Sequence, residues 1–318
     1  MARGHSPDLM SYLIVGVDGG GTKTKVIVAD AKGEELATAS GGGSAARPGQ
    51  TTHAAEVIAQ TVAEALAACE RTGEIPRVLC AGLAGAGREP ERQAVREALV
   101  RLEVADLVLV EPDATVALED AFGDGPGILL VSGTGSSCFG RSPSGQFSRC
   151  GGWGLNIGDE GSGAWIGRRA LSIAAAAADG REPETGLLPA VLAALELESS
   201  DGLVFWASHA DPAALAKLAG TVITVAATGD QRANSLLSLA AEELVTHVRA
   251  LARQLFTDER AAIPVALAGG LMERGSFLRK LVEQRLKSAV PGAAVRAEAV
   301  IPARGAVRLA LQSAKARG

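Results

Sequence analysis

The hydrophobic pattern opens with three short runs separated by turn residues. Tyr12–Val17 and Thr24–Ala29 are apolar and rich in β-branched residues, and a glycine-rich turn separates them. A second turn at Ala31–Glu34 leads into Glu35–Ser40. The pattern predicts three antiparallel strands, followed by a helix over Thr51–Thr72, where apolar positions recur at helical spacing.

Alternating strands and helices complete the first half of the chain. Arg77–Ala81 and Leu107–Val110 are short apolar runs typical of buried strands, and a helix is expected between them from about Glu89 to Leu102. A further helix begins near Asp113. The first half therefore reads as three strands, then helix, strand, helix, strand and helix.

The same order then starts again. Gly127–Ser132 is a predicted strand, and Ser136–Arg141 and Gln146–Cys150 form a hairpin around a turn at Ser142–Gly145. A mostly helical stretch follows from about residue 160 to residue 256. Within it, one apolar stripe at spacings of three and four predicts a long helix with a buried face: Leu237, Ala240, Leu244, Val248, Leu251 and Leu255.

Strand and helix signals return near the end of the chain. Pro264–Ala268 is a predicted strand, and a helix follows from about Ser276. A strand near Ala294–Ala299 and a last helix near Ala303–Ala314 complete the pattern. The second half thus repeats the first, with helices inserted.

This duplication predicts an α/β fold with two mixed sheets. We expect an N-terminal lobe from residues 1–120 plus about 303–318, and a C-terminal lobe from residues 121–302. Duplicated halves of this kind normally hold their ligand in the cleft between them.

Size and charge narrow the classes of function. A chain of 318 residues exceeds what one hydrophobic core usually organises. The net charge is −5 and no Lys/Arg run is sustained, so a nucleic-acid partner is not expected and a small-molecule ligand is. No apolar stretch approaches the roughly 20 residues of a membrane-spanning helix, and Met1–Ser11 lacks a secretory signal. We therefore expect a cytoplasmic protein without a membrane anchor.

The first candidate site is the glycine-rich turn Asp18–Thr24, which reads DGGGTKT. Backbone N–H groups of consecutive glycines can approach an anion closely, threonine hydroxyls can donate to phosphate oxygens, and Asp18 can orient a hydrated Mg²⁺. The chain continues into a strand and not into a helix, so the turn is neither a P-loop nor a dinucleotide-binding turn. It is predicted to bind a nucleotide polyphosphate, and the alternative is a hairpin turn without a ligand.

Two further glycine-rich loops lie in the second half. Ser132–Ser137 (SGTGSS) occupies the turn equivalent to Asp18–Thr24, so the two loops could hold different phosphates of one nucleotide. Ala268–Leu271 (AGGL) ends an apolar strand, and its paired glycines would let an adenosine lie against the backbone. Each of these two loops is, by itself, also compatible with a plain turn.

Asp113 is the candidate general base. It follows the predicted strand Leu107–Val110 and the pair Glu111-Pro112. A carboxylate at a strand end can accept the proton of an attacking hydroxyl in phosphoryl transfer. The alternative role is that of a helix N-cap, which the following Ala-Thr-Val sequence would suit.

The segment Cys150–Gly163 (CGGWGLNIGDEGSG) combines many glycines with one tryptophan and an acidic pair. Polar groups next to an apolar ring are typical of a site for sugar hydroxyls. Alternatively, Trp153 is a core residue, and Asp159 and Glu160 are acids in the first turn of a helix.

Taken in order, DGGGTKT, EPDA, SGTGS, CGGWGLNIGDEGSG and LAGG resemble the N-acetylglucosamine kinases among the BadF/BadG/BcrA/BcrD-type ATPases. The resemblance implies a duplicated ribonuclease H-like (actin-like ATPase) fold, two closing lobes, a homodimer, and ATP- and Mg²⁺-dependent phosphorylation of an amino sugar, most often at O6. It also implies roles for individual residues. Asp113 would be the catalytic base; the nucleotide would contact Asp18, Gly20, Gly21, Thr22, Lys23, Gly133, Thr134, Gly135, Ser136, Gly269 and Gly270; and the sugar would contact Asp113, Thr134, Gly135, Trp153, Gly154 and Asp159.

The chain departs from the mammalian enzyme of this family in two loops. The loop after the third strand reads Ser44-Ala45-Ala46-Arg47 where that enzyme has an Asn, and Ala84 stands where it has a sugar-contacting Ser. Fewer polar groups would then reach the N-acetyl side of the sugar. A glucosamine kinase of the same fold is therefore an alternative.

A different class with this fold comprises ATP-driven activators of acyl-CoA reductases and dehydratases, which hold an iron–sulfur cluster between subunits. The chain has four cysteines, and none forms a ligand pattern with the four histidines. Cys138 and Cys150 lie on the two arms of one predicted hairpin, which favours a local pair over a bridge between chains. A sugar-sensing repressor would need an N-terminal helix-turn-helix, for which Met1–Ser11 is too short.

Overall fold

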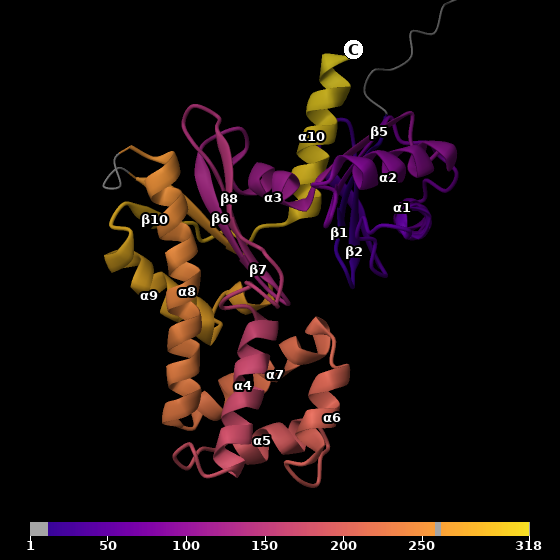
Figure 1. The fold of residues 1–318 in the computed structure, drawn as a ribbon. Coiled ribbons are helices and arrows are strands. Elements are labelled where there is room, and N and C mark those ends of the chain that lie inside the picture. The colour runs from indigo at the N-terminus through magenta and orange to yellow at the C-terminus, as the bar shows by residue number, and fades with distance from the viewer. Residues whose placement is uncertain (1–11, 258–261, 318) are drawn as a thin grey trace, which may run out of the picture. The chain divides into compact units, whose positions relative to one another are not determined.

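The computed structural model describes residues 12–257 and 262–317, so the expectations for Met1–Ser11 lie outside the described residues. The chain forms two compact units. The first contains residues up to Asp124 together with Val300 onward, and the second contains Gly125–Ala299. Figure 1 shows that the first unit combines the N-terminal strands with the C-terminal helix α10.

The first unit is built on a five-stranded sheet of order β3-β2-β1-β4-β5. Strands β1 to β3 are antiparallel, as the sequence predicts, whereas β4 and β5 run parallel to β1. The strands are β1 (Ile14–Gly19), β2 (Thr24–Ala29), β3 (Glu35–Gly41), β4 (Val78–Leu83) and β5 (Leu107–Pro112). The carboxyl ends of β1, β4 and β5 therefore share one edge of the sheet.

Helices cover both faces of this sheet (Figure 1). They are α1 (Thr51–Ala68), α2 (Glu89–Arg101), α3 (Asp113–Phe122) and α10 (Pro302–Ala316). Because side chains alternate along a strand, Val15 and Val17 pack in the core with α1 and α2, and Ile14 packs in the core with α3 and α10. Gly16 lets α10 approach β1, since a Cβ there would overlap the carbonyl oxygen of Ala303.

The second unit repeats this sheet in order, β10-β9-β6-β7-β8, which confirms the predicted duplication. Strands β6 to β8 are antiparallel, and β9 and β10 continue the sheet in parallel. The strands are β6 (Gly127–Ser132), β7 (Ser136–Arg141), β8 (Phe147–Gly151), β9 (Ile263–Ala268) and β10 (Ala293–Val295).

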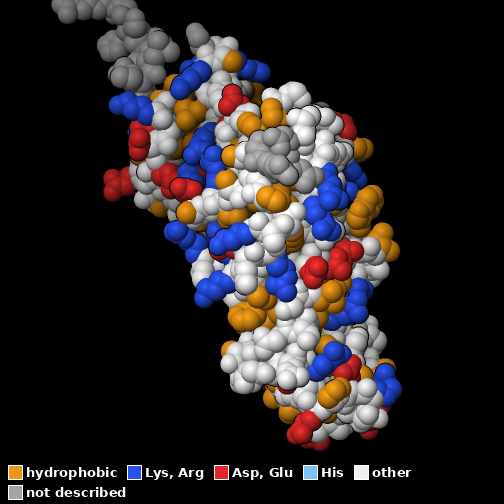
Figure 2. Space-filling model, turned by 90° about the vertical axis from the view of Figure 1, so that its left-hand side faces the viewer, with side chains coloured by type: hydrophobic (Ala, Val, Ile, Leu, Met, Phe, Trp, Pro, Cys, Tyr) orange, Lys and Arg blue, Asp and Glu red, His pale blue; other side chains and the backbone are white. Residues whose placement is uncertain are grey.

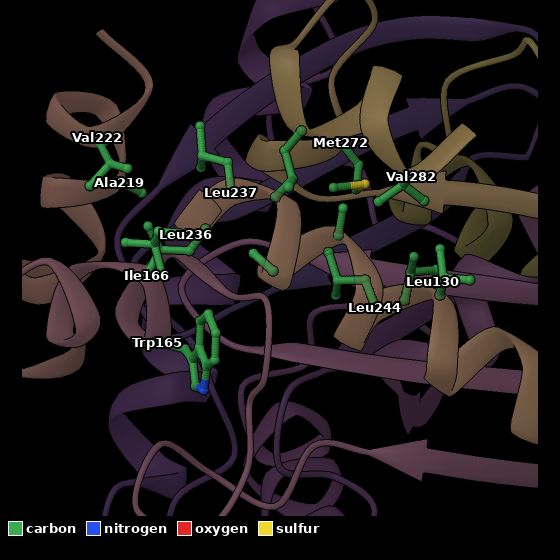
Figure 3. Close-up of a cluster of buried hydrophobic side chains, with 14 of the residues drawn as sticks. Leu130, Trp165, Ile166, Ala219, Val222, Leu236, Leu237, Leu244, Met272 and Val282 are labelled. Carbon is green, nitrogen blue, oxygen red and sulfur yellow. The ribbon is translucent and has the colours of Figure 1, made fainter. Parts of the chain in front are cut away.

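The helices of the second unit pack around a single apolar core. They are α4 (Gly163–Ala178), α5 (Leu187–Ala194), α6 (Gly202–His209), α7 (Pro212–Ala227), α8 (Gln231–Leu255), the 3₁₀ turn η1 (Gly270–Met272) and α9 (Phe277–Ala289). Figure 3 shows Leu237 and Leu244 of α8 directed into this core, near Met272 and Val282. All six positions of the predicted stripe on α8 are buried, which confirms that helix and its orientation.

Two elements are shorter than the pattern predicts. The helix expected to reach Thr72 ends at Ala68, because Glu70 adopts a left-handed φ of 61° and the N–H of Arg71 closes the helix end on the carbonyl of Leu66. The strand expected over Ala294–Ala299 is reduced to β10, which ends at Val295 at the edge of the second sheet.

Charged side chains of both signs are interspersed on the face shown in Figure 2. Within residues 12–257 and 262–317, no helix is long and apolar enough to cross a membrane. The four cysteines are free, and Cys138 lies directly opposite Cys150 across β7 and β8, so these two form the predicted local pair.

Candidate functional site

The turn between β1 and β2 is held in one shape by its neighbours. Gly20 N–H donates to the carbonyl of Lys23 at 2.9 Å, and Ser44 N–H donates to the carbonyl of Gly20 at 3.0 Å. The Oγ1 atom of Thr24 lies 2.7 Å from the Oγ of Ser44. A Cβ on Gly43 would overlap the carbonyl oxygen of Gly21, so the loop after β3 packs directly against the turn. The predicted set Asp18, Gly20, Gly21, Thr22 and Lys23 thus belongs to one glycine-rich turn that is hydrogen-bonded to the loop after β3.

Asp18 and Asp113 place two carboxylates at the same edge of the first sheet. Asp18 is near the end of β1, in register with Gly82 of β4, and Asp113 follows β5. Burial raises the pKa of Asp18 to about 6, and the negative charge of Asp113 adds to the rise, although Lys25 and Lys23 oppose it. When both carboxylates are ionised, this edge holds two negative charges, and a cation placed there would relieve their repulsion.

Asp113 is the first residue of α3, and the N-cap position belongs to Pro112. The N-cap role considered for Asp113 is therefore wrong, because the helix begins one residue earlier than that role requires. Its Oδ1 accepts the N–H of Ala114 at 2.9 Å, which orients the carboxylate. The residue is exposed to solvent, yet surrounding protein atoms desolvate the carboxyl enough to raise its pKa.

Asp18→Asn is expected to flatten the pH dependence of stability between about pH 4 and pH 6. The pKa of Asp18 is raised in the folded state, so the folded form keeps its proton over this interval while the unfolded form releases it. In wild type, the contribution of Asp18 to the free energy of unfolding is fully present below about pH 4. It is lost as the pH rises through 6, and the loss is at most about 3 kcal/mol. Urea unfolding of wild type, Asp18→Asn and the exposed control Asp106→Asn tests this; equal pH profiles for all three would contradict it.

The second glycine-rich loop is tied to the segment before α4. Ser132 Oγ donates to the carbonyl of Gly161 at 3.0 Å, and Ser136 Oγ donates to the carbonyl of Glu160 at 2.7 Å. Gly163 N–H donates back to the carbonyl of Gly133 at 2.8 Å. The predicted loop Ser132–Ser136 and the segment Cys150–Gly163 are therefore one structural feature, although separate motifs define them in the sequence.

Asp159 occupies the centre of this feature. It has a left-handed φ of 56°, and its carboxylate accepts N–H bonds from Gly154 and Ser136. A Cβ on Gly135 would lie 2.8 Å from Oδ2 of Asp159, so the carboxylate fits against that glycine. Burial raises the pKa of Asp159, and the two N–H bonds oppose the rise.

The alternatives considered for this segment are wrong. Trp153 is 65% exposed, so it is not a core residue, and the guanidinium of Arg149 lies 5.2 Å from its ring centre. Helix α4 begins at Gly163 with Ser162 as its N-cap, so Asp159 and Glu160 precede its first turn. An exposed ring next to an oriented carboxylate is an arrangement that can bind the apolar face and the hydroxyls of a sugar.

Gly269 and Gly270 lie against the second loop. Gly269 has φ 93°, and a Cβ there would overlap the carbonyl oxygen of Ser132. Gly270 begins η1 and lies next to Gly133. The three predicted nucleotide segments thus fall into two groups: Asp18–Lys23 in the first unit, and Ser132–Ser136 with Gly269 and Gly270 in the second.

Gly269→Ala is expected to lower the free energy of unfolding by about 3 kcal/mol, because the new methyl group meets backbone and the left-handed φ disfavours alanine. Gly270→Ala is the matched control, since nothing lies within 4 Å of a Cβ at that position. Urea denaturation of both variants measures the difference. Equal stabilities would show that the close approach to Ser132 does not constrain this turn.

His247 of α8 packs against this segment, although the sequence did not indicate it as a site residue. Its Nε2 lies 3.6 Å from Oε2 of Glu160, and a Cβ on Gly151 would lie 3.1 Å from the same nitrogen. Desolvation lowers the pKa of His247, and the charge of Glu160 opposes that shift. No local signal could have identified His247, because its partners come from a segment far away in the chain.

The residues present fit a magnesium ion bound mainly through phosphate oxygens and water. Among the described residues, no group of three or more His, Cys, Asp or Glu side chains could hold a metal ion by itself. Mg²⁺ normally uses one or two protein carboxylates and fills its other positions with water and substrate phosphates. The pair Asp18 and Asp113, next to a turn suited to phosphate, provides that kind of donor set.

Comparison with known proteins gives consistent matches over most of the chain. The model of the BadF/BadG/BcrA/BcrD ATPase family matches residues 15–310. An N-acetylmuramic acid/N-acetylglucosamine kinase of Clostridium acetobutylicum is 30% identical over 85% of this chain and 88% of its own length. An N-acetyl-D-glucosamine kinase of Dictyostelium discoideum is 28% identical over 95% of this chain and 99% of its own. The solved structure of a candidate N-acetylglucosamine kinase from Chromobacterium violaceum has a TM-score of 0.80 and 31% identity, and the alignment covers 95% of this chain and 99% of that one.

Proposed function

Because the chain belongs to the BadF/BadG/BcrA/BcrD ATPase family, we propose that it is an ATP-dependent kinase of amino sugars. The finer proposal is transfer of the γ-phosphate to O6 of N-acetylglucosamine, with Asp113 as the general base. The observation that carries this proposal is the pair of carboxylates, Asp18 and Asp113, at one sheet edge next to a glycine-rich turn. The named activities of the relatives support the substrate class.

Each proposed site residue of the first unit has a defined role in this mechanism. Asp113 accepts the proton of the attacking hydroxyl, and its raised pKa makes it a stronger base than an ordinary aspartate. Asp18, ionised above about pH 6, would help to hold a hydrated Mg²⁺, whose positive charge would offset that of the phosphate oxygens. The turn at Gly20–Lys23 supplies backbone and side-chain donors for the phosphates. Phosphoryl transfer needs little more than this positioning and charge stabilisation.

In the second unit, we propose that Gly133, Thr134, Gly135 and Ser136 contact the phosphates, and that Gly269 and Gly270 contact the adenosine. Trp153, Gly154 and Asp159, with Thr134 and Gly135, would contact the sugar. The bonds from Gly154 and Ser136 support this role for Asp159, because they hold its carboxylate in one orientation.

We propose a cytoplasmic homodimer as the form in which the enzyme works. The four free cysteines suit a reducing compartment. Val204 and Phe205 of α6 are 79% and 72% exposed, and neighbouring exposed apolar side chains are typical of association surfaces. A solution mass equal to that of a single 32.2 kDa chain would contradict the dimer.

The experiment that tests the function is release of ADP from Mg-ATP in the presence of single sugars, with the phosphorylated sugar identified by mass. The panel contains N-acetylglucosamine, glucosamine, N-acetylmannosamine, glucose and no sugar. Turnover that depends on N-acetylglucosamine is the expected result, and preference for glucosamine would support the alternative suggested by Ala45, Ala46 and Ala84. ADP release that no sugar changes would contradict the kinase and favour an ATPase activator of an acyl-CoA enzyme.

A further inference from the structure

Helix α8 contacts the segment Cys150–Gly163 near both of its ends, and all of these residues belong to the second unit. Near the first end, a Cβ on Gly151 would lie 3.1 to 3.3 Å from three ring atoms of His247, so the imidazole lies against that glycine. Near the other end, a Cβ on Gly161 would overlap the side chain of Leu244. Both glycines have a left-handed φ, of 74° and 76°. The helix therefore supports the base of the segment.

The residues between these two contacts form a loop that is bonded to itself. Gly158 N–H donates to the carbonyl of Gly154 at 2.8 Å, and Gly154 N–H donates to Oδ1 of Asp159 at 3.1 Å. A Cβ on Gly158 would lie 2.9 Å from the Cβ of Trp153. Because the loop is this compact, a shift at its base displaces Trp153 and Asp159 together.

Glu160 connects this loop to α8 and to the second glycine-rich loop. Its Oε2 lies 3.6 Å from Nε2 of His247, within the range of an ion pair. Ser136 Oγ donates to the carbonyl of Glu160 at 2.7 Å, and Ser136 N–H donates to the carboxylate of Asp159, the preceding residue. His247, Glu160, Ser136 and Asp159 thus form a continuous set of contacts that leads to a carboxylate of the proposed sugar site.

The imidazole of His247 is buried without a full set of partners. Only 9% of the residue is exposed. No residue that the structure describes forms a hydrogen bond with Nδ1, and the 3.6 Å between Nε2 and Glu160 is too long for one. A buried polar group that lacks hydrogen bonds destabilises a fold, and an apolar side chain of similar volume would not have this cost. The stability of α8 therefore gives no reason for a histidine at this position.

Resting on the kinase function proposed above, we propose that His247 is a positioning residue for the acceptor sugar, which acts through Gly151 and Glu160 to fix Trp153 and Asp159. A loop that is already fixed loses little conformational freedom when the sugar binds, so less of the binding free energy is offset by ordering. The bond from Ser136 goes to the backbone of Glu160, which the loss of the imidazole leaves in place. The effect is therefore expected on the sugar and not on Mg-ATP.

The test measures kcat and the KM values for Mg-ATP and for the sugar that wild type phosphorylates fastest. His247→Leu is expected to raise KM for the sugar about tenfold and to leave KM for Mg-ATP within about threefold of wild type. His247→Gln should recover most of the affinity, since its amide can donate to Glu160. Val245→Ala is the matched control, because Val245 is buried in the core on the same helix. Its loss of stability should leave KM for the sugar unchanged.

Two further measurements test the route through Glu160. Glu160→Gln should raise KM for the sugar about threefold, and the double variant with His247→Leu should exceed His247→Leu alone by less than that factor, because both changes remove one contact. Glu160→Gln keeps the shape of the side chain, so it tests the route even if His247→Leu fails to fold. Amide hydrogen exchange over residues 150–162 should become about tenfold faster in His247→Leu and stay unchanged in Val245→Ala.

The inference is wrong if His247→Leu and Glu160→Gln leave KM for the sugar unchanged in an enzyme that phosphorylates it, and the kinase function then stands without it. Equal rises in KM for the sugar and for Mg-ATP, or the same rise in Val245→Ala, would show a general structural role. Absence of turnover with every sugar in wild type would reject the kinase function, and this inference with it.

Discussion

Asp113→Asn is expected to lower kcat for phosphoryl transfer by a factor of about 10² to 10⁴, the range that general-base catalysis contributes. The asparagine side chain has the same shape, and its oxygen can still accept the N–H of Ala114, so helix α3 should begin as it does in wild type. What it loses is the capacity to take a proton from the attacking hydroxyl. Rates from ADP release and from phosphorylated sugar should fall together, whereas binding of Mg-ATP should persist.

The control for this variant is Glu111→Gln, which removes a carboxylate two residues earlier. Burial raises the pKa of Glu111, and its charged neighbours are Arg92 and Glu89 on α2, not Asp18. Loss of its charge should therefore change kcat by no more than about threefold. If Asp113→Asn retained near-wild-type turnover, or if Glu111→Gln lost as much, Asp113 would not be the base.

The hydrophobic pattern predicts the first and last residues of a strand or helix best where glycine or turn residues follow the apolar run. The bounds of β2, β6 and β7 agree with the runs Thr24–Ala29, Gly127–Ser132 and Ser136–Arg141, each of which ends at glycine or turn residues. The end of α1 was missed because its closing residue, Glu70, is not glycine, although it adopts a left-handed conformation. The hydrogen bond from the N–H of Arg71 to the carbonyl of Leu66 then closes the end of the helix.

The candidate site was likewise predictable from the sequence only in part. Residues that are close in sequence, such as Asp18 and Lys23, could be grouped from one motif, because a tight turn allows few arrangements of its backbone. Contacts between distant segments could not: the approach of Gly269 to Ser132, or of His247 to Glu160, depends on how strands and helices pack. The exposure of Trp153 could not be predicted either, because a tryptophan among glycines suits both a core and a ligand surface.

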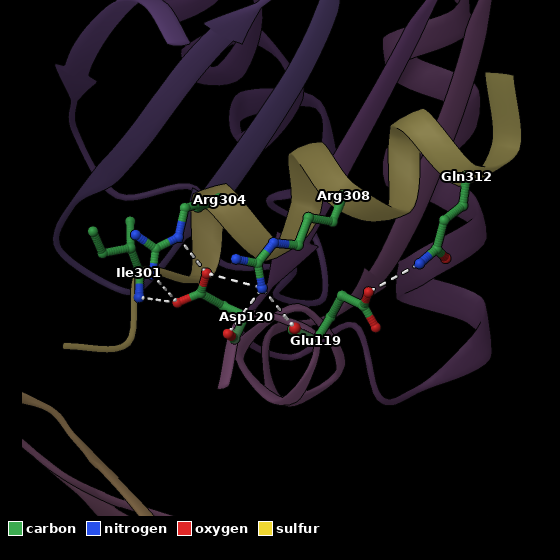
Figure 4. Close-up of polar contacts among 6 residues, drawn as sticks. All are labelled: Glu119, Asp120, Ile301, Arg304, Arg308 and Gln312. Carbon is green, nitrogen blue, oxygen red and sulfur yellow. Dashed lines mark hydrogen bonds and ion pairs between the residues drawn. The ribbon is translucent and has the colours of Figure 1, made fainter. Parts of the chain in front are cut away.

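The buried carboxylate of Asp120 ties the end of the chain to α3. Its side chain is 1% exposed, and it accepts bonds from Nε and Nη2 of Arg304 at 2.6 and 2.9 Å. It also accepts the backbone N–H of Ile301 at 2.7 Å. Figure 4 shows Arg308 approaching the same residue from the next turn of α10. One side chain therefore bonds both the start of α10 and the residue that leads into it.

Asp120→Ala is expected to lower the free energy of unfolding of the first unit by about 3 kcal/mol, because removing one partner of a buried charge pair leaves the others desolvated without compensation. Arg304 is about one-third exposed, which places the effect at the lower end of the range for buried pairs. Asp179→Ala is the control, since Asp179 and Arg181 form an ion pair at the surface whose side chains are 58% and 66% exposed. That variant should lose less than about 0.5 kcal/mol. Urea unfolding at neutral pH measures both.

The same variant connects the stability of α10 to the proposed chemistry. Asp113 and Asp120 are residues of one short helix, α3, and α10 packs along it. If the Asp120 bonds hold that helix in place, Asp120→Ala should reduce kcat under conditions where the protein remains folded, because Asp113 loses a fixed support. Full activity in a folded but destabilised variant would show that β5 alone positions the base. A stability loss no larger than that of Asp179→Ala would instead show that apolar packing of α10 on β1 and β4 holds the end of the chain.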